Sequence, residues 1–213
     1  MTNKEFALAV FMVTAITTGA SSAQPARDYV TIVGSYVVQP MAISKTTQAK
    51  LPQVQANGTG AGFKSFCAGV DIETPDATTS TRPNRSSELD LCKKNRVTEI
   101  VEIRFGYDAI VAAHARGGKI DELNHKEVSV DGIGPTLIAV SRKAYTLTFP
   151  LLLYVKKAHI NLIQSLKGYL AELTSEKAIG TTGYLYNMGV VPMPLLERNQ
   201  VRADVDGLKL LPM

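Results

Sequence analysis

The stretch QANGTGAGFKSFCAG, residues 55–69, places Gly58, Gly60, Gly62 and Gly69 within fifteen residues and leads directly into a short amphipathic segment. Glycine allows the backbone to approach a ligand closely, and several amides that converge ahead of a helix form a concavity that attracts anions. The partial positive charge of a helix N-terminus adds to that attraction. The stretch therefore indicates an oxyanion cradle with the Thr59 hydroxyl as an additional donor, and an ordinary glycine-rich turn is the alternative.

Two nucleotide-binding motifs are excluded for this stretch. A Walker loop ends in Gly-Lys-Ser or Gly-Lys-Thr, and no such ending occurs here. The dinucleotide fingerprint requires a different glycine spacing and an acidic residue further along the chain.

The composition is that of an ordinary globular protein, with 213 residues, of which 45% are apolar and 20% charged. This length suffices for one good core or two small ones. The net charge of +4 is mild, lysine and arginine are spread along the chain, and tryptophan is absent. Because no basic stripe or base-stacking platform is present, we expect no nucleic-acid partner.

The first 23 residues have the pattern of a secretory signal peptide. Lys4 precedes an apolar run of eleven residues, 6–16, which is too short to span a bilayer, and small residues follow it. Ser21 and Ala23 fit the small-x-small rule for cleavage. The prediction is a signal peptide over 1–23 and export of the mature chain, with a buried N-terminal helix as the alternative.

The two cysteines, Cys67 and Cys92, are even in number, and an oxidising compartment lets them pair. We therefore expect a disulfide, and two free buried thiols are the alternative. Two cysteines this far apart, with three scattered histidines, lack the spacing of a zinc site, so no metal is expected.

Strand-like and helix-like segments alternate along the chain, which points to an α/β sheet. The apolar stripe of the longest predicted helix recurs at steps of three and four residues, and Gly180 supplies a stop. Pro150 argues that its strand lies at an edge or bends. The predicted strands are 29–34, 99–106, 107–113 and 146–157, and the predicted helices are 40–50, 86–95 and 160–180.

Five segments in register resemble one protein family. They are YVTIVGSYVVQPMA (29–42), GTGAGFKSFCAG (58–69), PDATTSTRPNRSSELDLCKKN (75–95), VEIRFGYDAIV (101–111) and the long segment 153–194. Together they look like the phosphate-binding protein of bacterial phosphate ABC importers. The resemblance covers two blocks, 28–118 and 129–205.

The resemblance implies a periplasmic binding protein that holds phosphate between two α/β lobes and delivers it to a membrane permease. In this family three loops of the first lobe contact the anion. Hydroxyls, loop amides and a forked guanidinium are the groups that a tetrahedral dianion needs. The corresponding residues here are Ser35, Tyr36 and Val37 in the first loop, Thr59 and Gly60 in the second, and Thr81 and Arg82 in the third.

The chain departs from the family in two places. The family's first loop carries serines and threonines where this chain has Tyr36 and Val37. A long stretch that builds the second lobe is missing between ARGGK (115–119) and VSVDGIGPT (128–136). We therefore expect the α/β fold of a type II periplasmic-binding-protein-like lobe, with a mixed sheet flanked by helices. This single lobe comprises 24–118 and 129–213 around a splice at 119–128.

The expected function is an exported solute-binding protein of a phosphate ABC transporter with weakened affinity. Three or four hydrogen bonds to an anion that stays wet on one side give about 4 kcal/mol, or roughly millimolar affinity. The alternative is a degenerate one-lobe remnant that acts as a protein-interaction module. Expected partners are inorganic phosphate, a permease and a second copy of the chain; no cofactor is expected. Because no paired carboxylates, catalytic triad or nucleophile elbow occurs, we expect no enzyme.

Overall fold

The computed structural model describes residues 27–37, 50–111, 113–115 and 125–213. The predicted signal peptide, nearly all of the predicted helix 40–50 and residues 119–124 of the predicted splice lie outside the described residues.

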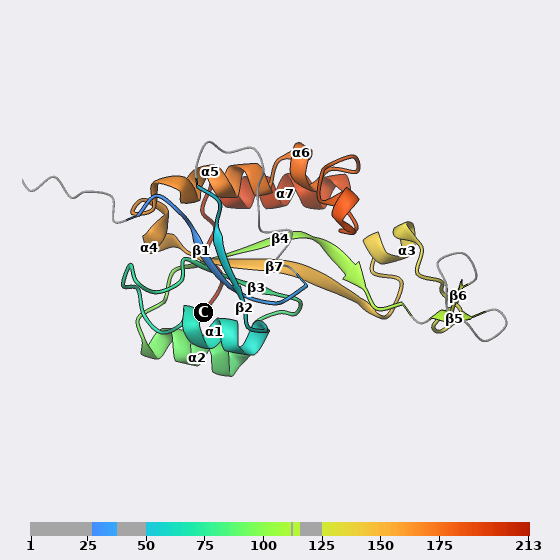
Figure 1. Cartoon of the computed structure of the whole chain (residues 1–213), viewed down its shortest axis with the longest axis horizontal. Coiled ribbons are helices and arrows are strands. Elements are labelled where there is room, and N and C mark those ends of the chain that lie inside the picture. The colour runs from blue at the N-terminus through green and yellow to red at the C-terminus, as the bar shows by residue number, and fades with distance from the viewer. Residues whose placement is uncertain (1–26, 38–49, 112, 116–124) are drawn as a thin grey trace, which may run out of the picture.

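A five-stranded mixed sheet forms the centre of the molecule, in the order β2-β1-β3-β7-β4 (Figure 1). Strands β1, β2 and β3 are parallel, and β7 is antiparallel to both of its neighbours. Strand β4 therefore runs in the same direction as β1–β3. The strands are β1 (Thr31–Gly34), β2 (Gln53–Ala56), β3 (Ala77–Ser80), β4 (Ile100–Ala109) and β7 (Thr148–Lys156), and a separate two-stranded sheet contains β5 (Ala113–Ala115) and β6 (His125–Glu127).

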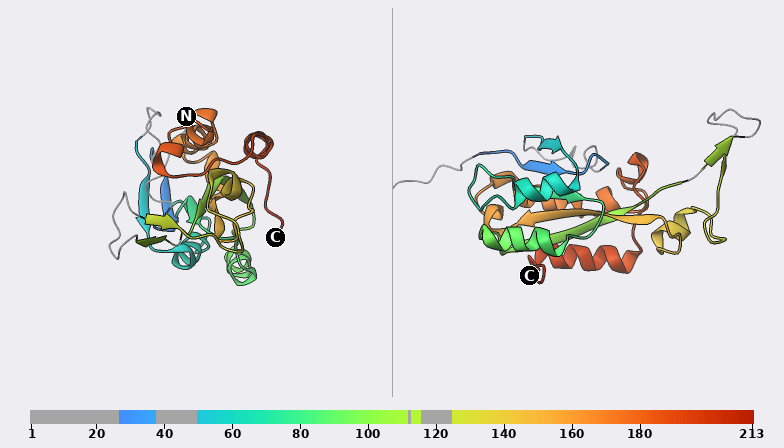
Figure 2. Two further views of the ribbon diagram at one scale, coloured as in Figure 1. Left: turned by 90° about the vertical axis from the view of Figure 1, so that its right-hand side faces the viewer. Right: turned by 90° about the horizontal axis from the view of Figure 1, so that it is seen from below.

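Helices cover both faces of the central sheet. Helices α1 and α2 lie on one face and α4–α7 on the other (Figures 1 and 2). The fold is thus a single α/β lobe with a mixed sheet flanked by helices, as predicted. The helices are α1 (Thr59–Phe66), α2 (Ser86–Lys94), α3 (Leu137–Ser141), α4 (Lys157–Ile160), α5 (Gln164–Leu173), α6 (Glu176–Ile179), the 3-10 helix η2 (Tyr186–Met188) and α7 (Leu195–Asp206).

The alternation of side chains along the strands divides the core into two clusters. In β7, Leu152 and Tyr154 join the cluster against α1 and α2, whereas Leu151 and Leu153 join the larger cluster against α5 and α7. Successive residues of a strand point to opposite faces, so a run that is apolar at every position is buried on both sides. This explains why the β7 segment LLLYV contains no polar break.

Three sequence-based predictions need correction. The two strands expected at 99–106 and 107–113 are one strand, β4, with an irregularity between Arg104 and Gly106. The helix expected over 160–180 is two helices, because Ser175 begins α6 by accepting a hydrogen bond from the Ala178 amide. Strand β7 lies inside the sheet rather than at its edge. Pro150 is nevertheless tolerated, because β3 pairs with β7 only as far as Leu152 and Pro150 has only β4 beside it.

A disulfide joins Cys67, directly after α1, to Cys92 in α2, as predicted. Both cysteines are fully buried, beside Phe63 and Phe66. The bond links the two helices that cover one face of the sheet.

We expect the double substitution Cys67→Ala/Cys92→Ala to lower the free energy of unfolding by about 3 kcal/mol, because the unfolded chain regains loop entropy. Urea denaturation with and without a reductant measures the effect. The oxidised wild type is the reference, and the reduced wild type should match the variant to within about 1 kcal/mol. Equal stability of the oxidised and reduced wild type would contradict the prediction.

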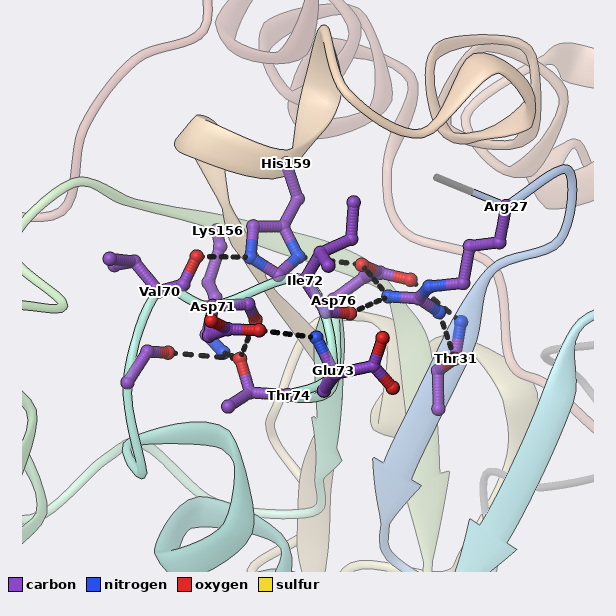
Figure 3. A network of polar contacts seen from close by, with 11 residues as sticks. Arg27, Thr31, Val70, Asp71, Ile72, Glu73, Thr74, Asp76, Lys156 and His159 are labelled. Carbon is purple, nitrogen blue, oxygen red and sulfur yellow. Dashed lines mark hydrogen bonds and ion pairs between the residues drawn. The ribbon is translucent and has the colours of Figure 1, made fainter. Parts of the chain in front are cut away.

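A buried charged cluster occupies the opposite end of the sheet from the carboxyl ends of β1–β3 (Figure 3). The carboxylate of Asp76 lies 2.6 Å from Nη2 of Arg27 and 2.6 Å from Nδ1 of His159, and it accepts the Thr31 amide at 2.7 Å. Nε2 of His159 lies 3.1 Å from the carbonyl oxygen of Val70. Both ring nitrogens of His159 therefore lie next to oxygen atoms, one of the Asp76 carboxylate and one of the peptide backbone. Asp76 is therefore a fully buried carboxylate that connects Arg27, His159 and the backbone of β1.

Lys156 lies beside this cluster and is almost fully buried. Its ammonium donates to the hydroxyl of Thr74 at 2.6 Å and stands over the ring of Phe66. Burial lowers the pKa of Lys156 to about 7, although the nearby Asp76 opposes the shift. The positive charge of Arg27 also lowers the pKa of Lys156.

This shift predicts a pH dependence of stability. Between about pH 7 and the ordinary lysine pKa the unfolded chain binds more protons than the folded chain, so the free energy of unfolding rises with pH. The contribution of Lys156 has a slope of at most ~1.4 kcal/mol per pH unit. We expect Lys156→Met to remove that slope, as measured by urea denaturation at several pH values between neutral and alkaline. Parallel pH profiles of the variant and the wild type would refute the prediction.

Candidate functional site

Three loops that the sequence singled out meet at one edge of the sheet. Strands β2, β1 and β3 are adjacent and parallel, with Gly34 opposite both Ala56 and Thr79. The carboxyl ends of the three strands therefore lie side by side, and we call this the carboxyl edge. The residues that follow the strands are Ser35–Val37 after β1, Asn57–Gly60 after β2, and Thr81 and Arg82 after β3.

Close glycine packing places the start of α1 against β1. A Cβ atom at Gly62 would lie 2.5 Å from Cα of Gly34, and one at Gly34 would lie 2.3 Å from the carbonyl oxygen of Thr79. Gly34 also has a φ of 126°, a conformation that side chains disfavour. The glycines of the sequence pattern therefore have different roles. Gly62 permits contact between helix and strand, and Gly58 adopts the positive φ of 86° at the start of the helix.

The N-terminus of α1 has no side-chain cap. Its N-cap residue is Gly58, no side chain bonds to the first turn, and the first turn contains no acidic residue. The first intrahelical bond runs from the Gly62 amide to the Gly58 carbonyl oxygen. The amides of residues 59–61 therefore lack intrahelical acceptors and carry the positive end of the helix dipole. This arrangement offers several donors to an anion at the carboxyl edge.

Asn57 fixes the loop ahead of α1, and sequence reasoning did not identify it. Its side-chain oxygen accepts the Gly34 amide at 3.1 Å, and its own amide donates to the Gly34 carbonyl oxygen at 3.0 Å. The Gly58 amide donates to the same carbonyl oxygen at 2.8 Å. The Asn-Gly pair that precedes the helix was the available signal, because asparagine readily bonds to nearby backbone.

The three residues of the first loop, Ser35–Val37, differ in their exposure to solvent. Ser35 is buried, and its amide donates to the Thr79 carbonyl oxygen at 3.2 Å. Tyr36 and Val37 are exposed. The ring of Tyr36 lies near the start of α1, since a Cβ at Gly58 would approach it to 3.9 Å. Tyr36 therefore lies close to the residue that precedes α1.

The third loop is tied to α2. Arg82 forms two hydrogen bonds with Glu88, at 2.9 and 2.6 Å, and Glu88 also accepts the Arg85 amide at 2.7 Å. Burial opposes ionisation of Glu88, but these hydrogen bonds keep its pKa below the ordinary value. The hydrogen bond with Glu88 likewise raises the pKa of Arg82. The guanidinium is thus engaged within the protein, whereas the resemblance had assigned it to an anion.

The backbone of the third loop is also held from two sides. The Ser80 hydroxyl donates to the Arg82 carbonyl oxygen at 2.5 Å, and the Arg82 amide donates to the same hydroxyl at 3.2 Å. The Asn84 amide donates to the Tyr154 hydroxyl at 3.1 Å. Thr81 lies between these anchors and is half-buried. The loop is therefore preorganised, with Thr81 at the carboxyl edge.

Two further features of the described residues bear on function. No group of three or more His, Cys, Asp or Glu side chains in this part of the chain is arranged to hold a metal ion. No helix within the same residues is long and apolar enough to cross a bilayer.

A family model described as a PBP superfamily domain matches residues 18–131, which is more than half of the chain. The chain belongs to the PBP superfamily. This match includes all three loops of the carboxyl edge. No curated protein matches the sequence.

Solved structures share this PBP fold at low sequence identity. A possible phosphate binding protein from Planctomyces limnophilus aligns with a TM-score of 0.69 and 14% identity over 85% of this chain and 98% of its own. An ABC-type phosphate transport receptor from Vibrio cholerae aligns with a TM-score of 0.59 and 14% identity over 78% of this chain and 100% of its own. A Clostridium perfringens protein solved with bound phosphate aligns with a TM-score of 0.58 and 15% identity, again over 78% and 100%.

Proposed function

We propose that this chain is an exported solute-binding protein that binds inorganic phosphate at the carboxyl edge. The observation that carries the proposal is the uncapped N-terminus of α1 between the ends of three parallel strands. Amides at such a position bind anions without a charged side chain. The names of the structural neighbours, which concern phosphate binding and phosphate transport, point to the same ligand.

The proposed contacts come from all three loops. The amides of residues 59–61 and the Thr59 hydroxyl provide the central donors, and the first loop contributes the Ser35 hydroxyl and the backbone of Tyr36 and Val37. The third loop contributes Thr81. Arg82 contributes charge near the anion while it remains bonded to Glu88. Since a carboxylate already occupies its guanidinium, we expect Arg82 to matter less than the helix amides.

The proposed affinity is weak for the isolated chain. An anion held by one lobe stays in contact with water, and its hydrogen bonds are worth nearer ~1 kcal/mol each than the ~1.5–3 of a desolvated charge. Roughly millimolar binding follows. A signal peptide over 1–23, a periplasmic location and a permease partner complete the proposal, together with a lobe built from 24–118 and 129–213.

Substitution of Gly60 tests the site directly. Gly60 is exposed, and a Cβ there meets nothing within 4 Å. Gly60→Asp places a carboxylate among the amides, where it favours the helix dipole but repels phosphate. We expect this variant to be as stable as the wild type or more stable, and to lose phosphate binding in isothermal titration at low salt.

Gly60→Asn is the matched control, because it has the same shape without the charge. It should retain binding to within about threefold. Equal phosphate affinity of the Asp and Asn variants, or a heat of binding absent from the wild type at about 10 mM phosphate, would contradict the proposed site.

A protein-interaction module is the second candidate function. Large apolar side chains are exposed on α3 and at the start of α7, among them Ile138, Leu195 and Leu196. Phosphate-dependent thermal stabilisation, stronger for phosphate than for sulfate, favours phosphate binding. Association of the chain without any thermal stabilisation by either anion favours the module.

A further inference from the structure

An arm leaves the body at the carboxyl edge. We define the arm as Ile110, Val111, β5, β6 and residues 128–135. Near their junction with the arm, β4 and β7 continue as a two-stranded ribbon from Tyr107–Pro150 to Ala109–Thr148, beyond the point where β3 pairs with β7. The β5–β6 pair stands away from the central sheet and its helices (Figures 1 and 2). Two strands of three residues each are too small to be stable by themselves in water.

The arm exposes apolar side chains on both of its segments. Ile110 is 62% exposed and Val111 45% exposed on the outgoing segment, and Val128 and Ile133 are also exposed on the returning segment. Single exposed apolar residues are ordinary, but a group of them on a projecting element marks an interaction surface. The arm therefore needs an apolar partner.

An apolar groove of about 460 Å³ lies beside the base of the arm. Its walls come from α3, from the segment that precedes α7, and from the start of α7. The groove is at the carboxyl end of β4, because Val191 in its wall bridges to Tyr107. The principal apolar residues of the groove are Leu137, Ile138, Val191, Pro192, Met193 and Leu195.

Each of the two surfaces carries an exposed charge, and these two charges have opposite signs. Glu127 at the end of β6 is exposed on the arm, and Arg142 is exposed at the rim of the groove. Neither side chain has an ion-pair partner among the described residues. The arm is apolar and carries a carboxylate, and the neighbouring groove is apolar and carries a guanidinium. One chain therefore has two surfaces that could contact each other across an interface between two copies.

We propose that two copies of this chain form a dimer in which the arm of each copy lies in the groove of the other. In a dimer with two-fold symmetry both arms and both grooves are occupied, so no third copy can join through the same surfaces. Strand β4 runs parallel to β1–β3, so the arm leaves the sheet on the same side as the carboxyl edge. In the dimer each copy then covers the open side of the other copy's anion site. This last step rests on the proposed phosphate site; the pairing itself does not.

Sedimentation of the mature chain in phosphate-free buffer tests the pairing. We expect a dimer at concentrations up to about 100 µM. Ile138→Glu in the groove and Val111→Glu on the arm should each weaken dimerisation at least about tenfold. Both residues are exposed, so neither change disturbs the core. Leu162→Glu is the control, because Leu162 is half exposed in the short segment between α4 and α5, and α4 lies at the opposite end of the molecule from the arm (Figure 1). This variant should dimerise as the wild type does.

Charge reversal adds an independent readout. Arg142→Glu and Glu127→Arg should each weaken the dimer, and the double variant should regain part of the lost affinity. A wild type that remains monomeric at about 100 µM, or an Ile138→Glu variant that dimerises like the wild type, overturns the proposal.

Titration with phosphate distinguishes the proposed pairing from the proposed phosphate site. If each copy closes the other's site, the monomeric Ile138→Glu variant should bind phosphate about tenfold more weakly than the wild type. A wild-type dimer that binds no phosphate contradicts the proposed function and leaves the pairing in place. Equal phosphate affinity of the wild-type dimer and the monomeric variant contradicts closure of the site by the second copy.

Discussion

Gly62→Ala is expected to lower the free energy of unfolding by about 2–3 kcal/mol, although alanine is the better helix former. The added methyl group would lie 2.5 Å from Cα of Gly34 and 2.7 Å from the Thr78 hydroxyl. The first contact is with backbone, which has no rotamer to change, so α1 must move away from β1. That movement also displaces the amides of the proposed anion site, and we expect phosphate affinity to fall with stability.

Gly168→Ala is the matched control for this prediction. Gly168 lies inside α5, and a Cβ atom there would meet nothing within 4 Å, so alanine should stabilise the protein by about 0.5–1 kcal/mol. Urea denaturation of both variants decides the question. A Gly62→Ala protein that is as stable as the wild type would show that α1 and β1 are not in close contact.

Asp76→Ala is expected to lower the free energy of unfolding by about 3–5 kcal/mol, because it leaves the largely buried charge of Arg27 without its partner. Arg27 loses its ion-pair partner, His159 loses the oxygen beside its Nδ1, and the Thr31 amide loses its acceptor. With a total stability of about 5–15 kcal/mol for a typical domain, such a loss brings the chain close to unfolding at physiological temperature.

Asp71→Ala is the control, since Asp71 is exposed and accepts only the nearby Glu73 amide with its carboxylate. It should change stability by less than about 1 kcal/mol. Asp76→Asn should lie between the two, because it keeps an acceptor but removes the charge. If Asp76→Ala and Asp71→Ala unfold at the same urea concentration, the cluster does not stabilise the fold.

Much of the architecture was accessible from short-range patterns. The β-branched run ending at Gly34, the serine start and lysine end of 86–94, and the apolar run before Lys156 each correspond to an element of the structure. Strand β2 was not predicted, because its sequence QVQA has one strongly apolar residue and depends on β1 for its pairing. The break between α5 and α6 was missed because the apolar repeat continues through the Ser175 cap.

The candidate site was predicted less completely than the fold. The glycine-rich stretch 55–69 indicated the loop ahead of α1, and the family resemblance indicated the loops at Ser35–Val37 and at Thr81 and Arg82. The sequence contained no sign that Arg82 would pair with Glu88, although the two are only six residues apart. It likewise left Asp76 and His159 unrelated, and these two residues are 83 positions apart in the chain.

The amino-acid sequence by itself determined the local elements, the disulfide partners and the positions where the backbone needs glycine, because these depend on periodicity, composition and the conformational limits of single residues. Only the tertiary structure decided that three loops share the carboxyl edge, that Arg82 is bonded to Glu88, and that Asp76 is buried beside Arg27 and His159. Such contacts depend on the order and direction of strands, which bring distant residues together and which no short stretch of sequence encodes.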